Sequence, residues 1–179
     1  GTRKRTVRAG TPLSVSIRPA SVSAVARAHA LIFSKSGSPH PPSWEWIGRL
    51  CPGKPALAMR TRPLGLFGPG GEKREPGEPT LAFCGIGKPE GFFADLEAFG
   101  AKVVAKAIFA DHHRYRIKDV SALMAQARQA GAARMATTDK DAVKIDPEWL
   151  SGLPLLVFRV EPDFMGGEDK LIELCLGAG

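Results

Sequence analysis

The stretch LAFCGIGKPEGFFADLEAFGAKVVAKAIFADHH, residues 81–113, contains the pattern that decides the fold. It begins with an apolar segment, Leu81–Cys84, of the length of a short buried strand. Pro89 suits the first turn of a helix, and Gly100 suits the residue that follows one. Between them, large apolar side chains recur with helical spacing: Phe92, Phe93, Leu96 and Phe99. A second apolar segment, Lys102–Phe109, follows, so the stretch predicts a strand–helix–strand unit.

The same alternation continues toward the C-terminus. Asp119–Ala130 has one apolar face and predicts a helix, and Ala133–Thr137 predicts a strand. Pro154–Val160 predicts another strand, and Gly167–Leu176 predicts a final helix. Strands that alternate with helices at this spacing are typical of βαβ units. We therefore predict an α/β fold, with a mostly parallel sheet flanked by helices.

The chain before this region has a different composition. Residues 1–26 show no clear period and predict a basic, weakly ordered N-terminal segment. Residues 27–79 predict a partial linker or hinge region with short strands. Within it, Arg62–Thr80 is rich in glycine, proline and charge, which is typical of a long loop without a core. The predicted α/β lobe therefore covers residues 80–179.

The net charge of +7 comes from the N-terminal part of the chain. Residues 1–44 hold seven basic residues and no acid, whereas the other 18 basic residues are balanced by 18 acids. Such a segment can contact phosphate on nucleic acid or on lipid head groups, or it can be a solvated tail, which is the commoner case.

The apolar segments and the cysteines exclude several classes of protein. No run of 18 apolar residues is present, so we expect no membrane span, and the basic N-terminus lacks the apolar region of a secretory signal. Cys51, Cys84 and Cys175 lack CxxC spacing. They favour a reducing compartment and argue against a disulfide framework or a structural zinc site.

Polar or glycine-rich segments follow three of the predicted strands. They are Gly85–Gly87, Asp111–His113 and Thr138–Asp141. In open α/β sheets, ligands bind beyond the carboxyl ends of the strands. If the sheet is parallel, all three segments lie at one edge, and this edge is the predicted site.

The first and third segments each have a purely structural alternative. Gly85 and Gly87 are compatible with a tight turn between strand and helix and nothing more. Thr138 or Asp139 is compatible with a helix cap, and Lys140 with a solvated partner of an acid.

The middle segment combines an acid with two histidines. Asp111 could orient His112 through a hydrogen bond, with or without a chemical task for the pair. We interpret Asp111 and His112 as functional, and we expect His113 to be a bystander.

Two other segments resemble known motifs but lack residues that those motifs require. GRLCPGKP, residues 48–55, resembles a phosphate-binding loop, but Pro55 stands where Ser or Thr must bind Mg²⁺, and a predicted strand follows instead of a helix. The Asp-His-His triplet occurs in metal-dependent phosphoesterases, which also need aspartates upstream. The first aspartate here is Asp95, on a predicted helix, so that two-metal site cannot be assembled.

Three segments in this order and spacing carry a family resemblance: LAFCGIGKPEGFFADLEAFGAKV, FADHHRY and TTDKDAVKI. They resemble the C-terminal half of tetraacyldisaccharide 4′-kinase, the lipid A pathway kinase of Gram-negative bacteria. The similarity runs from about Arg27 to the end of the chain. It implies the C-terminal lobe of a P-loop kinase, whose active site lies between two α/β lobes.

The resemblance also implies an activity and a set of site residues. The family transfers the γ-phosphate of ATP, with Mg²⁺, to the 4′-hydroxyl of tetraacyldisaccharide 1-phosphate, at the cytoplasmic face of the inner membrane. Its Asp-His motif matches Asp111 and His112, and the histidine is thought to support an aspartate base of the other lobe. The implied substrate-binding or cleft-lining residues are Gly85, Gly87, Thr138, Lys140 and Asp141.

The chain departs from the family in one large respect. The Walker A loop and the acidic Mg²⁺ ligands of the N-terminal lobe are not found in this sequence. Since these groups position and neutralise the phosphates, we expect a fragment that is inactive without the N-terminal kinase lobe, with no metal ligands of its own. The expected partners are that lobe, the acylated disaccharide and the inner-membrane surface, and not nucleic acid. The alternative is a non-catalytic module that binds anionic lipid or nucleic acid through its basic N-terminus.

Overall fold

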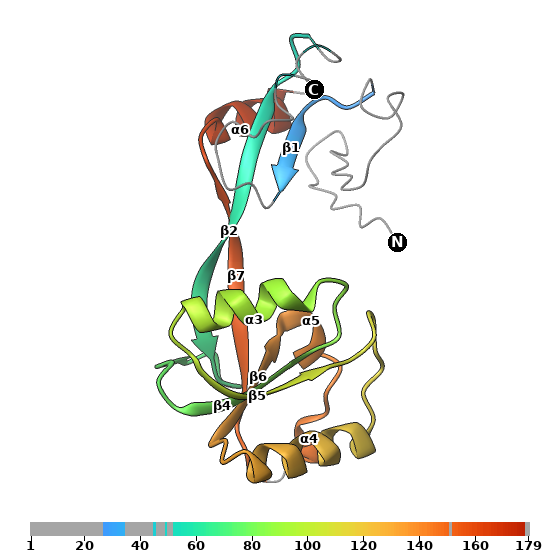
Figure 1. Cartoon of the computed structure of the whole chain (residues 1–179). Helices are drawn as coiled ribbons and strands as arrows, with labels where there is room; N and C mark the ends of the chain where they lie inside the picture. The colour runs from blue at the N-terminus through green and yellow to red at the C-terminus, as the bar shows by residue number, and fades with distance from the viewer. Residues whose placement is uncertain (1–26, 35–44, 46–48, 50–51, 151, 178–179) are drawn as a thin grey trace. The chain divides into compact units, whose positions relative to one another are not determined.

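The computed structural model describes residues 27–34, 45, 49, 52–150 and 152–177 (Figure 1). The chain divides into two compact units. The first unit comprises Gly1–Arg62 and Pro162–Gly179, and the second unit is Pro63–Glu161. The predicted basic segment, residues 1–26, lies outside the described residues. All three predicted site segments belong to the second unit.

A mostly parallel sheet forms the second unit. Its central strand is β4 (Pro79–Cys84), which pairs in parallel with β5 (Lys102–Ile108) on one side and β6 (Arg134–Thr138) on the other. Strand β6 pairs in parallel with β7 (Leu155–Phe164), and β2 (Ala56–Phe67) lies beside β7. The predicted α/β fold with a mostly parallel sheet is confirmed.

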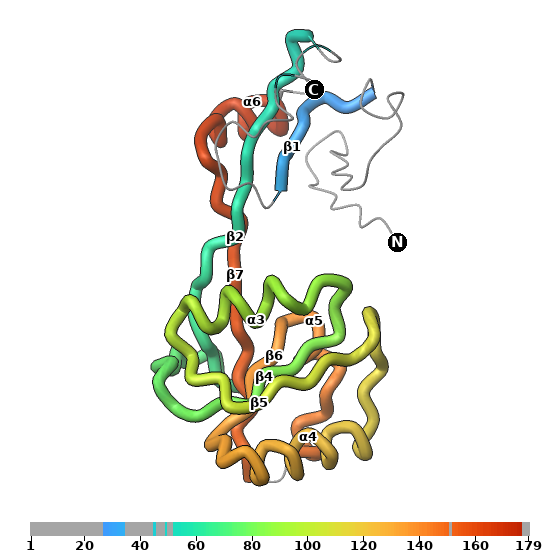
Figure 2. The backbone as a smooth tube through the Cα atoms, viewed as in Figure 1, coloured from blue at the N-terminus to red at the C-terminus, as the bar shows by residue number. Residues whose placement is uncertain are grey.

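Helices connect these parallel strands. The backbone passes from β4 through α3 (Pro89–Ala98) to β5, and from β5 through α4 (Ile117–Gln129) to β6 (Figure 2). The short helix α5 (Asp139–Ala142) directly follows β6, and a 3₁₀ turn, η1 (Pro147–Trp149), precedes β7. Of the described helices, none is long and apolar enough to cross a membrane.

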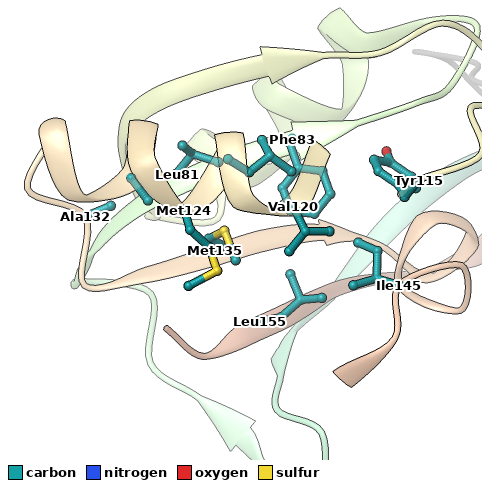
Figure 3. Close-up of a cluster of buried hydrophobic side chains, with 11 residues drawn as sticks. Leu81, Phe83, Tyr115, Val120, Met124, Ala132, Met135, Ile145 and Leu155 are labelled. Atoms are coloured by element: carbon teal, nitrogen blue, oxygen red, sulfur yellow. The ribbon is translucent and has the colours of Figure 1, made fainter. Parts of the chain in front are cut away.

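The two long helices cover opposite faces of the sheet. Because side chains alternate along a strand, β4 contributes to two separate cores. Leu81 and Phe83 pack in the cluster with α4 (Figure 3), and Ala82 and Cys84 pack in the cluster with α3. All four side chains are fully buried, so β4 is the centre of the unit.

The termini of α3 agree with the sequence, whereas α4 begins at Ile117, two residues before the predicted Asp119. Helix α3 begins at Pro89 as predicted. Gly100, just beyond its end, has a φ of +99°, a backbone conformation that glycine adopts readily. The predicted stop at this glycine is therefore confirmed.

The prediction of a loop over Arg62–Thr80 is wrong for its first part. Strand β2 continues to Phe67, and residues Leu66–Phe67 pair antiparallel with β3 (Lys73–Arg74). Leu66 is fully buried in the cluster with α3. Because glycines and prolines surround Leu66, the sequence showed no strand pattern here, although the strand contributes one large side chain to the core. The second unit accordingly starts at Pro63 and ends at Glu161, whereas the sequence suggested residues 80–179.

The first unit has a small described part. Strand β1 (Leu31–Ser34) pairs in parallel with residues Ala56–Met59 of β2, and α6 (Glu168–Gly177) ends the described chain. The N–H of Met165 donates to the carbonyl oxygen of Ala58, and Arg60 forms an ion pair with Asp163 at 2.6 Å.

Candidate functional site

The three polar segments meet at the carboxyl edge of the sheet. The N–H of Gly85 donates to Oδ2 of Asp141 at 2.9 Å, and the N–H of His112 donates to the carbonyl oxygen of Gly85 at 3.2 Å. A Cβ atom at Gly87 would lie 3.3 Å from Oδ2 of Asp111. The loop after β4 therefore contacts both of the others, as the parallel sheet predicted.

Asp111 and His112 are exposed at this edge. Their side chains are 54% and 70% exposed, and Nε2 of His112 lies 3.7 Å from Oδ2 of Asp111. That separation is too long for a hydrogen bond, so the orienting bond considered from the sequence is not formed here. Both groups face solvent and are accessible to another molecule.

The backbone of His112 is unusual. Its φ is +61°, the one positive value among the described residues other than glycine. The left-handed region costs an L-residue on the order of 1–2 kcal/mol. Such strain persists only where neighbouring structure fixes it, and it concentrates at functional sites.

His113 has a structural environment. Its Nε2 lies 3.1 Å from Oδ2 of Asp119, and its ring stacks on Phe109 with centroids 4.7 Å apart. The same Asp119 oxygen accepts the N–H of Arg116 at 2.9 Å, at the start of α4. The hydrogen bond from His113 lowers the pKa of Asp119. His113 thus joins the end of β5 to the first turn of α4, and its lack of a catalytic task stays a prediction.

Asp141 lies beneath this edge instead of lining it. Its side chain is fully buried, with Oδ2 accepting from Gly85 N–H and from the hydroxyl of Thr138, and Oδ1 accepting from Lys144, each at 2.9 Å. Burial alone raises the pKa of a carboxyl group. The hydrogen bonds from Gly85, Lys144 and Thr138 outweigh burial and hold the pKa of Asp141 below its ordinary value. Asp141 is therefore a charged internal group.

The remaining residues of the third segment have mixed environments. The hydroxyl of Thr138 accepts the N–H of Asp141 at 3.3 Å and caps α5, as its structural alternative predicted. Asp139 accepts a hydrogen bond from Arg159 at 3.2 Å. Lys140 is exposed at the same edge, so it is accessible to a ligand.

Gly85 is held in a tight space. A Cβ atom there would lie 3.1 Å from the carbonyl oxygen of Ala110, and 3.2 Å from both Cβ of His113 and the hydroxyl of Tyr115. Overpacking of this kind typically costs about 1–3 kcal/mol. We therefore expect Gly85→Ala to lower the free energy of unfolding by that amount, measured by urea denaturation.

The matched control for Gly85 is Gly77. A Cβ atom at Gly77 would have no neighbour within 4 Å, and its φ is not in the left-handed region. Gly77→Ala should therefore leave the urea midpoint unchanged or raise it slightly. Equal destabilisation by the two substitutions would show that crowding at Gly85 is not the cause.

Comparison with known proteins identifies the family of this chain. The family described as tetraacyldisaccharide-1-P 4′-kinase, LpxK, matches residues 17–177. The chain belongs to this kinase family. A tetraacyldisaccharide 4′-kinase of Rhodospirillum rubrum is 40% identical over 126 residues, which is 70% of this chain and 36% of the relative. One from Anaeromyxobacter dehalogenans is 38% identical over 97 residues, or 53% of this chain and 26% of the relative.

A solved structure agrees with the fold. The structure of LpxK from Aquifex aeolicus in complex with ATP matches with a TM-score of 0.51 at 21% identity, over 90% of this chain and 45% of that one. At this identity the likeness shows the fold alone, a mostly parallel sheet flanked by helices. The chain spans well under half the length of these kinases.

The described residues of this kinase family member do not form a site for Mg²⁺. Among them, no three His, Cys, Asp or Glu side chains gather closely enough to hold a metal ion. The carboxylates of Asp119, Asp139 and Asp141 are each engaged by basic or N–H donors.

Two buried groups lie close to this edge: Cys84, which the sequence placed at the end of its strand, and Tyr115, which sequence reasoning missed. Tyr115 is 5% exposed, its hydroxyl has no hydrogen-bond partner among the described residues, and burial and the charge of Asp141 raise its pKa. Burial and Asp141 also raise the pKa of Cys84 to about 11, so this thiol stays protonated at neutral pH. Tyr115 could have been found from its position, since it is an aromatic residue two positions after the histidine pair.

Proposed function

We propose that this chain is the C-terminal part of a kinase that phosphorylates the 4′-hydroxyl of tetraacyldisaccharide 1-phosphate with ATP. The observation that carries the proposal is the exposed Asp111–His112 pair at the carboxyl edge of a parallel sheet in a member of this family. Ligands of α/β proteins bind at that edge. The named relatives are tetraacyldisaccharide 4′-kinases, which supports the choice of substrate.

His112 is the proposed catalytic residue of this chain. Its exposed imidazole can form a hydrogen bond and is accessible to a second lobe. In the proposed mechanism it hydrogen-bonds a carboxylate of the N-terminal kinase lobe, which removes the proton of the 4′-hydroxyl. Asp111 places its carboxylate 3.7 Å from the ring. Exposed Lys140 is the proposed contact for the anionic substrate.

The proposed kinase acts in the cytoplasm, peripherally at the inner membrane. Its partners are the missing lobe, the acylated disaccharide and the membrane surface, without nucleic acid. The alternative of a binding module depends on residues 1–44, of which the structure describes only residues 27–34. No described feature favours that alternative over the kinase.

The proposal predicts that the 179-residue chain alone makes no phosphorylated disaccharide from ATP, Mg²⁺ and the lipid precursor. The groups that neutralise the phosphates are not among its residues, and phosphoryl transfer depends on them. Activity should appear in a chimera in which residues 17–177 replace the corresponding part of the Rhodospirillum rubrum relative.

Product formation is measured with radiolabelled ATP and thin-layer separation of the lipids. The unaltered relative is the positive control. Product from the chain alone would contradict its inactivity, and a folded but inactive chimera would contradict the proposed function.

A further inference from the structure

A chain of contacts runs through the three loops of the site. Asp141 follows β6, Gly85 follows β4 and His112 follows β5. The carboxylate of Asp141 accepts the N–H of Gly85 at 2.9 Å, and the carbonyl oxygen of Gly85 accepts the N–H of His112 at 3.2 Å. Gly85 is therefore held on both sides, by the buried acid and by the exposed histidine.

The acid is the fixed end of this chain of contacts. Asp141 is fully buried, and both of its oxygens are engaged, by Gly85 and Thr138 on Oδ2 and by Lys144 on Oδ1. Hydrogen bonds to an ionised acceptor are roughly twice as strong as those between neutral groups. Removing the charge would loosen the position of the Gly85 N–H.

The histidine is the strained end. The φ of +61° at His112 needs support from its surroundings, and its N–H has the Gly85 carbonyl oxygen as acceptor. Gly85 has little room to shift toward Ala110, His113 and Tyr115, which lie close to the position that a Cβ atom would take. The position of Gly85 thus decides whether the acceptor of the His112 amide stays in place.

We propose that Asp141 is a positioning residue for His112, acting through Gly85. Asp141 keeps the peptide of Gly85 in place, and that peptide keeps His112 in its left-handed conformation with the ring toward solvent. This role replaces the expectation that Asp141 lines the cleft, and its effect on catalysis rests on the proposed function. A purely stabilising acid would instead leave the conformation of His112 unchanged in a folded variant.

The test compares Asp141→Asn with Lys144→Met in the whole 179-residue chain by NMR. Asp141→Asn removes the charge that holds Gly85 N–H. Lys144→Met removes the partner of the other carboxylate oxygen and leaves the contact with Gly85. Amide exchange of Gly85 and His112, together with the amide–Hα coupling of His112 that reports φ, is measured in both variants.

We expect Asp141→Asn to speed exchange of both amides at least about tenfold relative to the global rate, and to change the His112 coupling. Lys144→Met should leave the coupling unchanged. An unchanged His112 coupling in folded Asp141→Asn, or equal effects of the two variants, would overturn the proposal. If Asp141→Asn does not fold, Thr138→Val removes one hydrogen bond to the same oxygen and must shift both amides in the same direction.

Kinetics in the chimera separate this proposal from the proposed function. Asp141→Asn should lower kcat at least about tenfold with little change in KM, because positioning acts on the chemical step. An inactive parent chimera would contradict the proposed function. The NMR result would still decide whether Asp141 positions His112. An unchanged kcat despite a displaced His112 would show that its position does not matter for turnover.

Discussion

Replacement of His112 by alanine in the chimeric kinase is expected to lower turnover about 10²–10⁴-fold, with the thermal unfolding midpoint unchanged. The ring is 70% exposed and makes no described hydrogen bond, so its loss removes little packing. A histidine that orients or polarises a catalytic carboxylate contributes a factor of this size to the rate. Turnover and unfolding are measured on the same preparation.

The neighbouring His113 is the internal control. His113→Ala removes the contact with Asp119 and the stacking on Phe109, which should cost on the order of 1–2 kcal/mol of stability. Turnover per folded molecule should remain close to that of the parent. Equal loss of turnover in both variants would remove the distinction between the histidines and, with it, the proposed role of His112.

The largest loss of stability is expected for Phe83→Ala, at about 3–5 kcal/mol. Phe83 is fully buried at the centre of the sheet, and its ring contacts those of Phe109 and Tyr115 at centroid distances of 6.4 and 5.8 Å. Its removal leaves a cavity that the surrounding strands cannot close. Urea denaturation of the whole chain, followed by circular dichroism, measures the change.

Ile108 offers a matched control for Phe83. It is a large apolar residue of the neighbouring strand but is 61% exposed, so Ile108→Ala should change stability by less than about 0.5 kcal/mol. A cost for Phe83→Ala close to that of Ile108→Ala would show that the cluster with α4 is not the core of the second unit.

The parts of the fold that could be predicted are those with a strong local pattern. The strand–helix–strand unit from Leu81 to Phe109 follows from a spacing of apolar residues that only one arrangement buries. Strand β2 beyond Arg62 had no such pattern, because glycine and proline surround the single buried Leu66. Burial of that residue depends on α3, which lies about 30 positions later in the chain.

The sequence predicted where the site lies but not how its side chains and backbone are arranged. Parallel strands bring their carboxyl ends to one edge, so the meeting of the three segments followed from the fold. Whether Asp141 faces solvent depends on donors from other elements, including Gly85, which is 56 positions away. The left-handed backbone of His112 likewise could not be predicted from the sequence. Histidine has no preference for positive φ that is strong enough to indicate it.

The contact between His113 and Asp119 has a consequence for sequence variation among relatives. Under the proposed function the two neighbouring histidines are constrained differently: position 113 joins a strand end to a helix, whereas position 112 presents an imidazole to the other lobe. An amide side chain long enough to reach Asp119 would meet the first demand without a titratable group. A substitution at 113 whose side chain cannot reach Asp119 is expected to be compensated at 119, so in those relatives the two positions should change together. His112 makes no such side-chain hydrogen bond among the described residues, and its proposed role should keep a histidine at this position.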